Sequence, residues 1–267
     1  MSSKKIGFIG CGNIASAIIG GACGMGYINY DNLYLFDTDS SKTDAFVKKG
    51  ANLCASAAQL VSRCDFVFLT IKPQIYDIVL PEIAEASRNA CIISVAAGIT
   101  VDYVKKLLGY DARVIRVMPN TPLMYGGGAT ALVHTAPVTD EDYSFVRQIF
   151  SLSGVCVDLD ESQINTVTAI SGSAPAYVLR FAKNLIGFAV SSGMNESDAK
   201  KLVLGTLAGT ALMAEESEED IDKLIRNVTS PNGTTYAGLC SMDETGFDDS
   251  LIQCLEATKN RAEELTK

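Results

Sequence analysis

A glycine-rich turn close to the start of the chain constrains the fold more than any other feature. Gly10-Cys-Gly12-Asn-Ile-Ala15 directly follows the apolar run 6–9 and opens a stretch with helical periodicity. A strand, a tight glycine turn and a helix in this order begin a dinucleotide-binding βαβ unit. Gly10 permits the tight turn, and Gly12 lets a pyrophosphate approach the backbone at the helix N-terminus. The residues expected around the pyrophosphate are Gly10, Gly12, Asn13 and Ile14.

Short apolar runs alternate with helical stretches through the first 160 residues. The runs 33–36, 65–71 and 91–95 are uninterrupted, as in strands of a parallel sheet that is covered on both faces. Further candidate strands are 113–117, 129–133 and 155–157. This pattern predicts an α/β class with an N-terminal Rossmann doubly wound sheet. Its ligand is expected at the carboxyl ends of the strands.

The second part of the chain has almost only helical periodicity. We predict helices at 174–190, 195–215 and 248–264, with Asn195 as a cap, and a solvated helix-loop segment at 215–222. The predicted domains are 1–160, a dinucleotide-binding Rossmann domain, and 161–267, an all-α domain. About 105 residues are few for an independent core, so we expect a second subunit to complete it.

Composition excludes several classes of partner. The chain has 267 residues, 22 basic and 31 acidic, and no basic block, which argues against nucleic acid. No apolar run reaches the ~18 residues of a spanning helix, and no signal peptide precedes the first strand, so we expect a cytoplasmic protein without membrane contact. The eight cysteines form no C-x-x-C pair and there is one histidine, so no metal site is expected.

Asp37 follows the second predicted strand, where a carboxylate usually binds the adenine ribose and repels a 2′-phosphate. This position favours NADH. Ser40, Ser41 and Lys42 follow and could hold a 2′-phosphate, although Ser40 and Asp39 are also good caps for a helix reaching Lys49. NADPH therefore stays an alternative to NADH.

Five further motifs occur in a fixed order along the chain. They are Ile71-Lys72-Pro73, Ser94-Val-Ala-Ala-Gly98, Arg116-Val-Met-Pro-Asn-Thr-Pro122, Ser171-Gly-Ser-Ala-Pro-Ala-Tyr177 and Thr229-Ser-Pro-Asn-Gly-Thr-Thr-Tyr-Ala-Gly-Leu239. Together with the glycine turn they resemble pyrroline-5-carboxylate reductase over essentially the whole chain. The segment 229–239 is the most specific element, because few other nicotinamide enzymes carry anything similar.

The resemblance implies an NAD(P)H-dependent oxidoreductase that reduces the C=N bond of pyrroline-5-carboxylate to give L-proline, the last step of proline biosynthesis. It implies a homodimer intertwined through the helical domain, often assembled into a decamer as a pentamer of dimers. The helical domain of one subunit would meet the cofactor of the other. By the resemblance, the residues along the cofactor are Asp37, Asp39, Thr70, Ile71, Lys72, Pro73 and Ala97. The position of Ser40 after Asp37 adds it to the expected cofactor contacts. Residues expected at the substrate are Glu218, Ser230, Gly233, Thr234 and Thr235.

Two positions depart from the family pattern. Ala174 stands where the family usually has Gly, which adds one methyl group near the domain junction. Asn232 also stands where Gly is common, and Asn tolerates positive φ better than most residues, so the loop can keep its shape.

Hydride transfer to a protonated imine needs neither a metal nor a covalent nucleophile, so the protein mainly orients the ring and fixes its carboxylate. Backbone N–H groups and hydroxyls of a Ser-, Gly- and Thr-rich loop suit a carboxylate. We assign the catalytic hydroxyl, which meets the ring nitrogen, to Thr235. Ser230 and Thr234 have an alternative role in capping and turn formation.

Two other functions fit a Rossmann domain followed by helices. β-Hydroxyacid dehydrogenases carry the motif G-x-x-G-x-x-x-K-x-x-x-N. Here Lys183 is followed four residues later by Gly187, where that motif has Asn. A non-catalytic dinucleotide sensor would not need the loop 229–235. His134, at a predicted strand end, and Lys72, before a proline, are not assigned as catalytic groups.

Overall fold

A computed structural model describes residues 3–267 and divides the chain into two compact units. One, here called the sheet unit, contains the chain up to Ser173 together with Thr258–Lys267. The other, the helical unit, is Ala174–Ala257. The domain boundary predicted between residues 160 and 161 stays a prediction.

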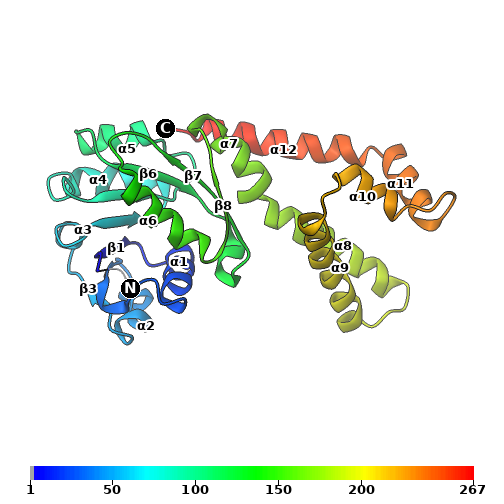
Figure 1. The fold of residues 1–267 in the computed structure, drawn as a ribbon, viewed down its shortest axis with the longest axis horizontal. Helices are drawn as coiled ribbons and strands as arrows, with labels where there is room; N and C mark the ends of the chain where they lie inside the picture. Colours follow the sequence, from blue (N-terminus) through cyan, green and yellow to red (C-terminus); the bar gives the residue numbers. More distant parts are fainter. Residues whose placement is uncertain (1–2) are drawn as a thin grey trace. The chain divides into compact units, whose positions relative to one another are not determined.

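The sheet unit is built on an eight-stranded sheet within residues 3–267 (Figure 1), with the order β3-β2-β1-β4-β5-β6-β7-β8. The strands are β1 (Ile6–Ile9), β2 (Leu33–Phe36), β3 (Asn52–Leu53), β4 (Phe66–Leu69), β5 (Cys91–Ser94), β6 (Val114–Met118), β7 (Gly128–His134) and β8 (Gly154–Asp158). The order reverses after β1, which is the switch point of a doubly wound fold. The predicted fold class is confirmed.

The last two strands run against the first six. β6 and β7 pair antiparallel, because only the short turn η4 (Thr121–Tyr125) joins them and a parallel pair needs a longer crossover. The helix α6 (Asp140–Ser151) supplies such a crossover between β7 and β8, which pair in parallel. The sequence predicted these strands but not their reversal.

Helices cover both faces of the sheet. The helices α1 (Asn13–Gly24) and α6 contribute buried side chains to the core on one face. The helices α3 (Ala57–Val61), α4 (Tyr76–Ile83) and α5 (Val101–Leu108) do so on the other. All residues of β1, β4 and β5 are buried, as the uninterrupted apolar runs predicted.

The stretch predicted as one helix up to Lys49 is shorter in the structure. Asp39 caps the 3-10 helix η2 (Ser40–Lys42) through its side chain, and the one-turn helix α2 (Asp44–Val47) follows. A turn then ends at Gly50, whose φ is +106°.

After β8 the chain becomes helical. The short helix η5 (Glu161–Gln163), α7 (Ile164–Val167) and the π-helical turn η6 (Thr168–Gly172) still belong to the sheet unit. The helical unit contains α8 (Ala174–Ser191), α9 (Glu196–Glu216), α10 (Ile221–Asn227) and α11 (Thr234–Glu244), and α12 (Phe247–Glu264) begins there. The structure confirms the predicted helices at α8, α9 and α12 and adds α10 and α11. No helix within residues 3–267 combines the length and apolar character needed to cross a bilayer.

Candidate active site

The glycine turn between β1 and α1 has the geometry of a phosphate cradle. The Gly10 N–H donates to the carbonyl of Phe36 at 2.8 Å, and its φ of +89° is in the left-handed region. A Cβ on Gly10 would lie 2.8 Å from the Thr70 carbonyl oxygen, so no larger residue fits. Gly12, the N-cap of α1, has no heavy atom within 4 Å of a Cβ position. The N-terminus of α1 is therefore open to a phosphate group.

Asp37 joins the end of β2 to this turn. Its Oδ2 accepts a hydrogen bond from the Cys11 N–H at 2.7 Å, and its Oδ1 accepts one from the Asp39 N–H at 2.8 Å. The side chain is 8% exposed, and Lys42 Nζ lies 3.4 Å from Oδ1. The carboxylate is thus held rigidly beside the glycine turn while one cation partly balances its charge.

Asp39 organises the residues that follow. Its carboxylate accepts hydrogen bonds from the Ser41 N–H at 3.2 Å and from the Ser41 hydroxyl at 2.6 Å. These bonds, with a smaller contribution from Lys42, lower the pKa of Asp39. Two carboxylates, those of Asp37 and Asp39, therefore follow the end of β2.

A hollow of about 320 Å³ lies at the carboxyl ends of β1, β2 and β4. Its lining comprises Ile9, Gly10, Gly12, Phe36, Asp37, Thr38, Lys42, Thr70, Ile71, Lys72, Ile75 and Val79. The structure thus brings Gly10, Gly12, Asp37, Thr70, Ile71 and Lys72 together around one hollow, and their cofactor-binding role stays a prediction. The sequence pattern did not indicate Thr38, although it directly follows Asp37, or the apolar wall of Phe36, Ile75 and Val79.

The other predicted cofactor residues are not part of the lining of this hollow. Asn13 and Ile14 form the first turn of α1, Ser40 opens η2, and Pro73 opens η3 (Pro73–Ile75). Ala97 is exposed in the loop after β5, whereas its neighbours Ala96 and Gly98 are buried. The roles of all these residues stay predictions.

The helical unit carries the second predicted group. Thr229–Gly233 form a turn in which the Gly233 N–H donates to the Ser230 carbonyl at 2.9 Å, and α11 begins at the next residue. Asn232 has a φ of +56°, the one non-glycine residue with positive φ within residues 3–267. The asparagine therefore takes the left-handed conformation that it was expected to tolerate.

Thr234 and Thr235 are not in a loop, as the sequence analysis supposed, but in the first turn of α11. Gly233 is the N-cap, and no side chain caps this helix. Ser230, Thr234 and Thr235 are exposed. The N-terminus of α11 therefore presents uncapped N–H groups beside two hydroxyls, a suitable arrangement for a carboxylate. Glu218 is exposed in the connection between α9 and α10.

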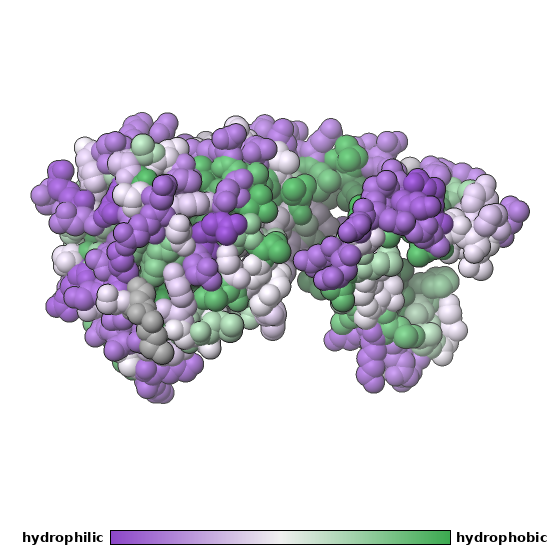
Figure 2. Space-filling model, viewed as in Figure 1, coloured by the Kyte–Doolittle hydropathy of each residue, from purple (hydrophilic) through white to green (hydrophobic). Residues whose placement is uncertain are grey.

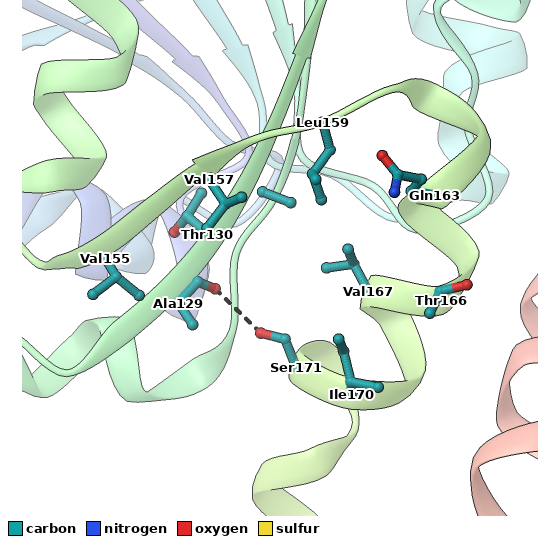
Figure 3. A pocket seen from close by; sticks show the side chains of 11 residues that line it. Ala129, Thr130, Val155, Val157, Leu159, Gln163, Thr166, Val167, Ile170 and Ser171 are labelled. Atoms are coloured by element: carbon teal, nitrogen blue, oxygen red, sulfur yellow. Dashed lines mark hydrogen bonds between the residues drawn. The ribbon is translucent and has the colours of Figure 1, made fainter. Parts of the chain in front are cut away.

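A second hollow of about 360 Å³ lies in the sheet unit between β7, β8 and α7 (Figure 3). Val155, Val157 and Ile170 line it and are 51–59% exposed. The Ser171 hydroxyl, drawn with its bond to the Ala129 carbonyl at 3.4 Å, is one of few polar groups there. The lining of the second hollow is too apolar to bind phosphate, whereas the first hollow includes the open glycine turn and charged side chains.

The chain offers little for metal or thiol chemistry. Within residues 3–267, no three His, Cys, Asp or Glu side chains are grouped so that they could hold a metal ion. The thiol nearest the glycine turn is that of Cys11. Burial, and then the charge of Asp37, raise the pKa of Cys11 to about 12, so the thiol stays protonated. The single histidine, His134, is exposed and stacks on Tyr143.

A doubly wound sheet with an open glycine turn, an acidic residue after β2 and a helical second unit defines a dinucleotide-binding oxidoreductase fold. Residues 161–265 match the family described as pyrroline-5-carboxylate reductase dimerisation, and residues 5–98 match "NADP oxidoreductase coenzyme F420-dependent". Pyrroline-5-carboxylate reductase of Escherichia coli is 35% identical over 99% of both chains. The Arabidopsis thaliana enzyme is 32% identical over 99% of this chain and 96% of its own.

Solved structures agree with this relationship. The pyrroline carboxylate reductase of Plasmodium falciparum with NADP bound is similar with a TM-score of 0.92 and 28% identity, over 100% of both chains. The Coxiella burnetii pyrroline-5-carboxylate reductase has a TM-score of 0.92 and 31% identity over 100% of both chains. The chain belongs to the pyrroline-5-carboxylate reductase family.

Proposed function

We propose that this protein reduces pyrroline-5-carboxylate to L-proline with NADH or NADPH, the last step of proline biosynthesis. Membership of the family supports this activity, since the relatives named above are pyrroline-5-carboxylate reductases. The structural observation that carries it is the uncapped N-terminus of α11 with the adjoining turn Thr229–Gly233. This arrangement suits a small carboxylate substrate, and a dinucleotide sensor has no use for it.

The residues of the chain have to orient and hold the reactants. A bound nicotinamide dinucleotide supplies the hydride. Gly10, Gly12 and the N-terminus of α1 fit its pyrophosphate, since Gly12 leaves the helix end open. The N–H groups of Thr234 and Thr235 would fix the substrate carboxylate, with Gly233 shaping the turn before them and Ser230 and Glu218 completing the site. The Thr235 hydroxyl would meet the ring nitrogen and hold the protonated imine in place.

We propose a modest preference for NADH. The Asp37 carboxylate follows β2, where negative charge repels a 2′-phosphate, and two backbone N–H groups keep it there. Lys42 favours NADPH, because its ammonium group lies 3.4 Å from the Asp37 carboxylate and could pair with a 2′-phosphate. NADPH use is therefore expected as well. A KM for NADH ten or more times that for NADPH would contradict the preference.

We propose that the helical unit forms a homodimer. Large apolar side chains are exposed on it, such as Phe188 at 75%, Leu179 at 66% and Leu202 at 61%, and green apolar residues reach its surface in Figure 2. Ala182, Ala199 and Leu224 are the buried apolar residues of this unit among the described residues, too few for a core. A second copy would cover this surface, and five such dimers would form the proposed decamer.

The proposed location is the cytoplasm, where thiols stay reduced. The eight cysteines form no disulfide bond within residues 3–267, and Cys23, Cys156, Cys240 and Cys254 are only partly buried.

One assay tests the proposed activity. Oxidation of NADH and of NADPH is followed at 340 nm with racemic pyrroline-5-carboxylate, and with 2-oxo acids as controls. We expect turnover with the imine and none with the oxo acids. Binding of NADH without turnover of the imine would indicate a sensor, and turnover of an oxo or hydroxy acid would indicate a dehydrogenase.

A further inference from the structure

The loop after β5, residues 95–100, lies next to the proposed cofactor site. Leu69 of β4 pairs with Ser94 of β5, so the loop continues beside Thr70 and Ile71, which line the hollow. Within the loop, Ala96 and Ile99 are buried and 6% and 1% exposed, whereas Ala97 is exposed. The loop therefore presents Ala97 outward from a buried support.

Part of that support is a segment more than 160 residues away, Leu265–Lys267, here called the latch. The Lys267 N–H donates to the Gly98 carbonyl at 2.7 Å. The Lys267 carbonyl accepts hydrogen bonds from the Thr100 hydroxyl at 2.6 Å and from the Thr100 N–H at 3.3 Å. The latch thus pairs with the loop much as an added strand would, through backbone groups on both sides of Ile99.

Gly98 allows this close approach. Its φ is +75°, and a Cβ there would lie 2.6 Å from the Leu265 carbonyl oxygen and 3.1 Å from the carbonyl carbon. Both obstacles are backbone atoms, so they cannot move aside as the end of a side chain can. The glycine of the Ser94–Gly98 motif is thus required by the latch as well as by its own backbone conformation.

Side chains attach the latch and the loop to the helices behind them. Lys267 Nζ lies 2.7 Å from the Asp77 carboxylate of α4, and Asp77 also accepts a hydrogen bond from Tyr103 of α5. At the far end of the loop, Glu161 Oε1 accepts from the Val101 N–H at 2.9 Å. Segments distant in sequence therefore hold the second half of the loop, from Gly98 to Val101.

We propose that the latch Leu265–Lys267 is a positioning element for the reaction, which holds the Ala97–Gly98 backbone against the nicotinamide end of the cofactor. This inference rests on the proposed function. The latch directly follows α12, which begins in the helical unit and ends in the sheet unit, and it holds the loop through hydrogen bonds. The glycine turn that would bind the pyrophosphate does not depend on the latch. Loss of the latch should therefore impair the orientation of the nicotinamide more than the affinity for the cofactor.

The test removes Leu265–Lys267 and, separately, replaces Gly98 by Ala. We expect kcat to fall about tenfold or more in each variant while the Kd for NADH changes less than threefold, since small misplacements cost rate. In the shortened chain, Gly98→Ala should lower kcat by a smaller factor than in the full chain, because the clash with Leu265 is gone and only the strain of the positive φ remains. The control Arg261→Ala, which removes an exposed pair with Glu264 on the same helix end, should keep kcat within twofold.

Hydrogen exchange gives a second measurement that does not need turnover. Amides of residues 95–101 should exchange at least tenfold faster in the shortened chain, with the glycine turn unaffected. Should the shortened chain fail to fold, Gly98→Ala decides through the same exchange and kcat measurements. Unchanged amide exchange at residues 95–101, or a kcat within twofold of that of the full chain, would refute the proposed role of the latch. Faster exchange in a protein that does not turn over the imine would support the latch and refute the proposed function.

Discussion

The Asp37 carboxylate accepts a hydrogen bond from the Cys11 N–H at 2.7 Å, so the residue expected at the adenine ribose also fixes the glycine turn. One side chain thus links cofactor preference to the shape of the phosphate cradle. A substitution at Asp37 should therefore change two measurable quantities together.

We predict that Asp37→Ser shifts the preference toward NADPH. Removing the charge ends the repulsion of a 2′-phosphate and frees Lys42 to bind it. The ratio of kcat/KM for NADPH to that for NADH should then rise by about tenfold, the gain expected from one hydrogen bond to a charged group. Lys42→Ala is the matched control and should move the ratio in the opposite direction. Loss of the bond to Cys11 should also lower the Tm of the Asp37 variant. An unchanged ratio would assign the preference to other residues.

The sequence predicts features that depend on local pattern. Each of these features has its periodicity or its cap within one segment: the glycine turn, the apolar strands and the long helices α8, α9 and α12. The cap of α9 is an example, since the Asn195 side chain accepts a hydrogen bond from the Ser197 N–H. The helix α11 was missed because Thr229–Leu239 is rich in Gly, Ser and Thr, which mask a helix start. The reversal of β7 and the pairing of Gly98 with Lys267 depend on contacts between distant segments, which periodicity does not encode.

We predict that Thr235→Ala lowers kcat/KM for pyrroline-5-carboxylate at least tenfold and leaves the Kd for NADH unchanged, because one hydrogen bond at the reacting ring is lost. Thr235→Ser keeps a hydroxyl and should retain most of the activity. Thr245→Ala removes a hydroxyl at the other end of α11 and serves as the control. Steady-state kinetics with NADH titrations by fluorescence measure both quantities. Normal kinetics in Thr235→Ala would remove this residue from the site.

We predict that Glu161→Ala destabilises the sheet unit by about 3 kcal/mol, a typical cost of leaving a buried charge unpaired. Arg116 is 3% exposed and pairs with Glu161 at 2.8 Å, and its Nη2 has no partner within the described residues. Glu161→Gln keeps an oxygen acceptor and should cost less. Urea unfolding at fixed protein concentration compares the variants, with Glu141→Ala, at an exposed pair with Lys4, as a control near zero. If Glu161→Ala and Glu141→Ala lower the free energy of unfolding equally, the buried pair adds nothing to stability.

We predict that Cys11 resists alkylation in the folded protein. Burial raises its pKa from 9.0 to about 12, so at pH 8 almost no reactive thiolate forms. Because the unfolded thiol loses its proton at lower pH than the folded one, the associated stability is complete below pH 9 and is lost as pH rises toward 12. Mass spectrometry after iodoacetamide treatment should show unmodified Cys11 in the native protein and modified Cys11 in guanidinium. Rapid native labelling at pH 8 would mean that the turn opens readily.

The proposed dimer gives the last prediction. Phe188 is 75% exposed on α8, and a dimer with two-fold symmetry would bury it twice. Phe188→Asp should therefore raise the dimer Kd by at least about 100-fold, since each buried aromatic contributes about 2–3 kcal/mol. Tyr125→Asp, at an aromatic residue of the sheet unit that is 90% exposed, is the matched control. Sedimentation equilibrium should show monomers for the first variant and dimers for the second. Dimers of equal stability in both would mean that the apolar face of α8 serves another contact.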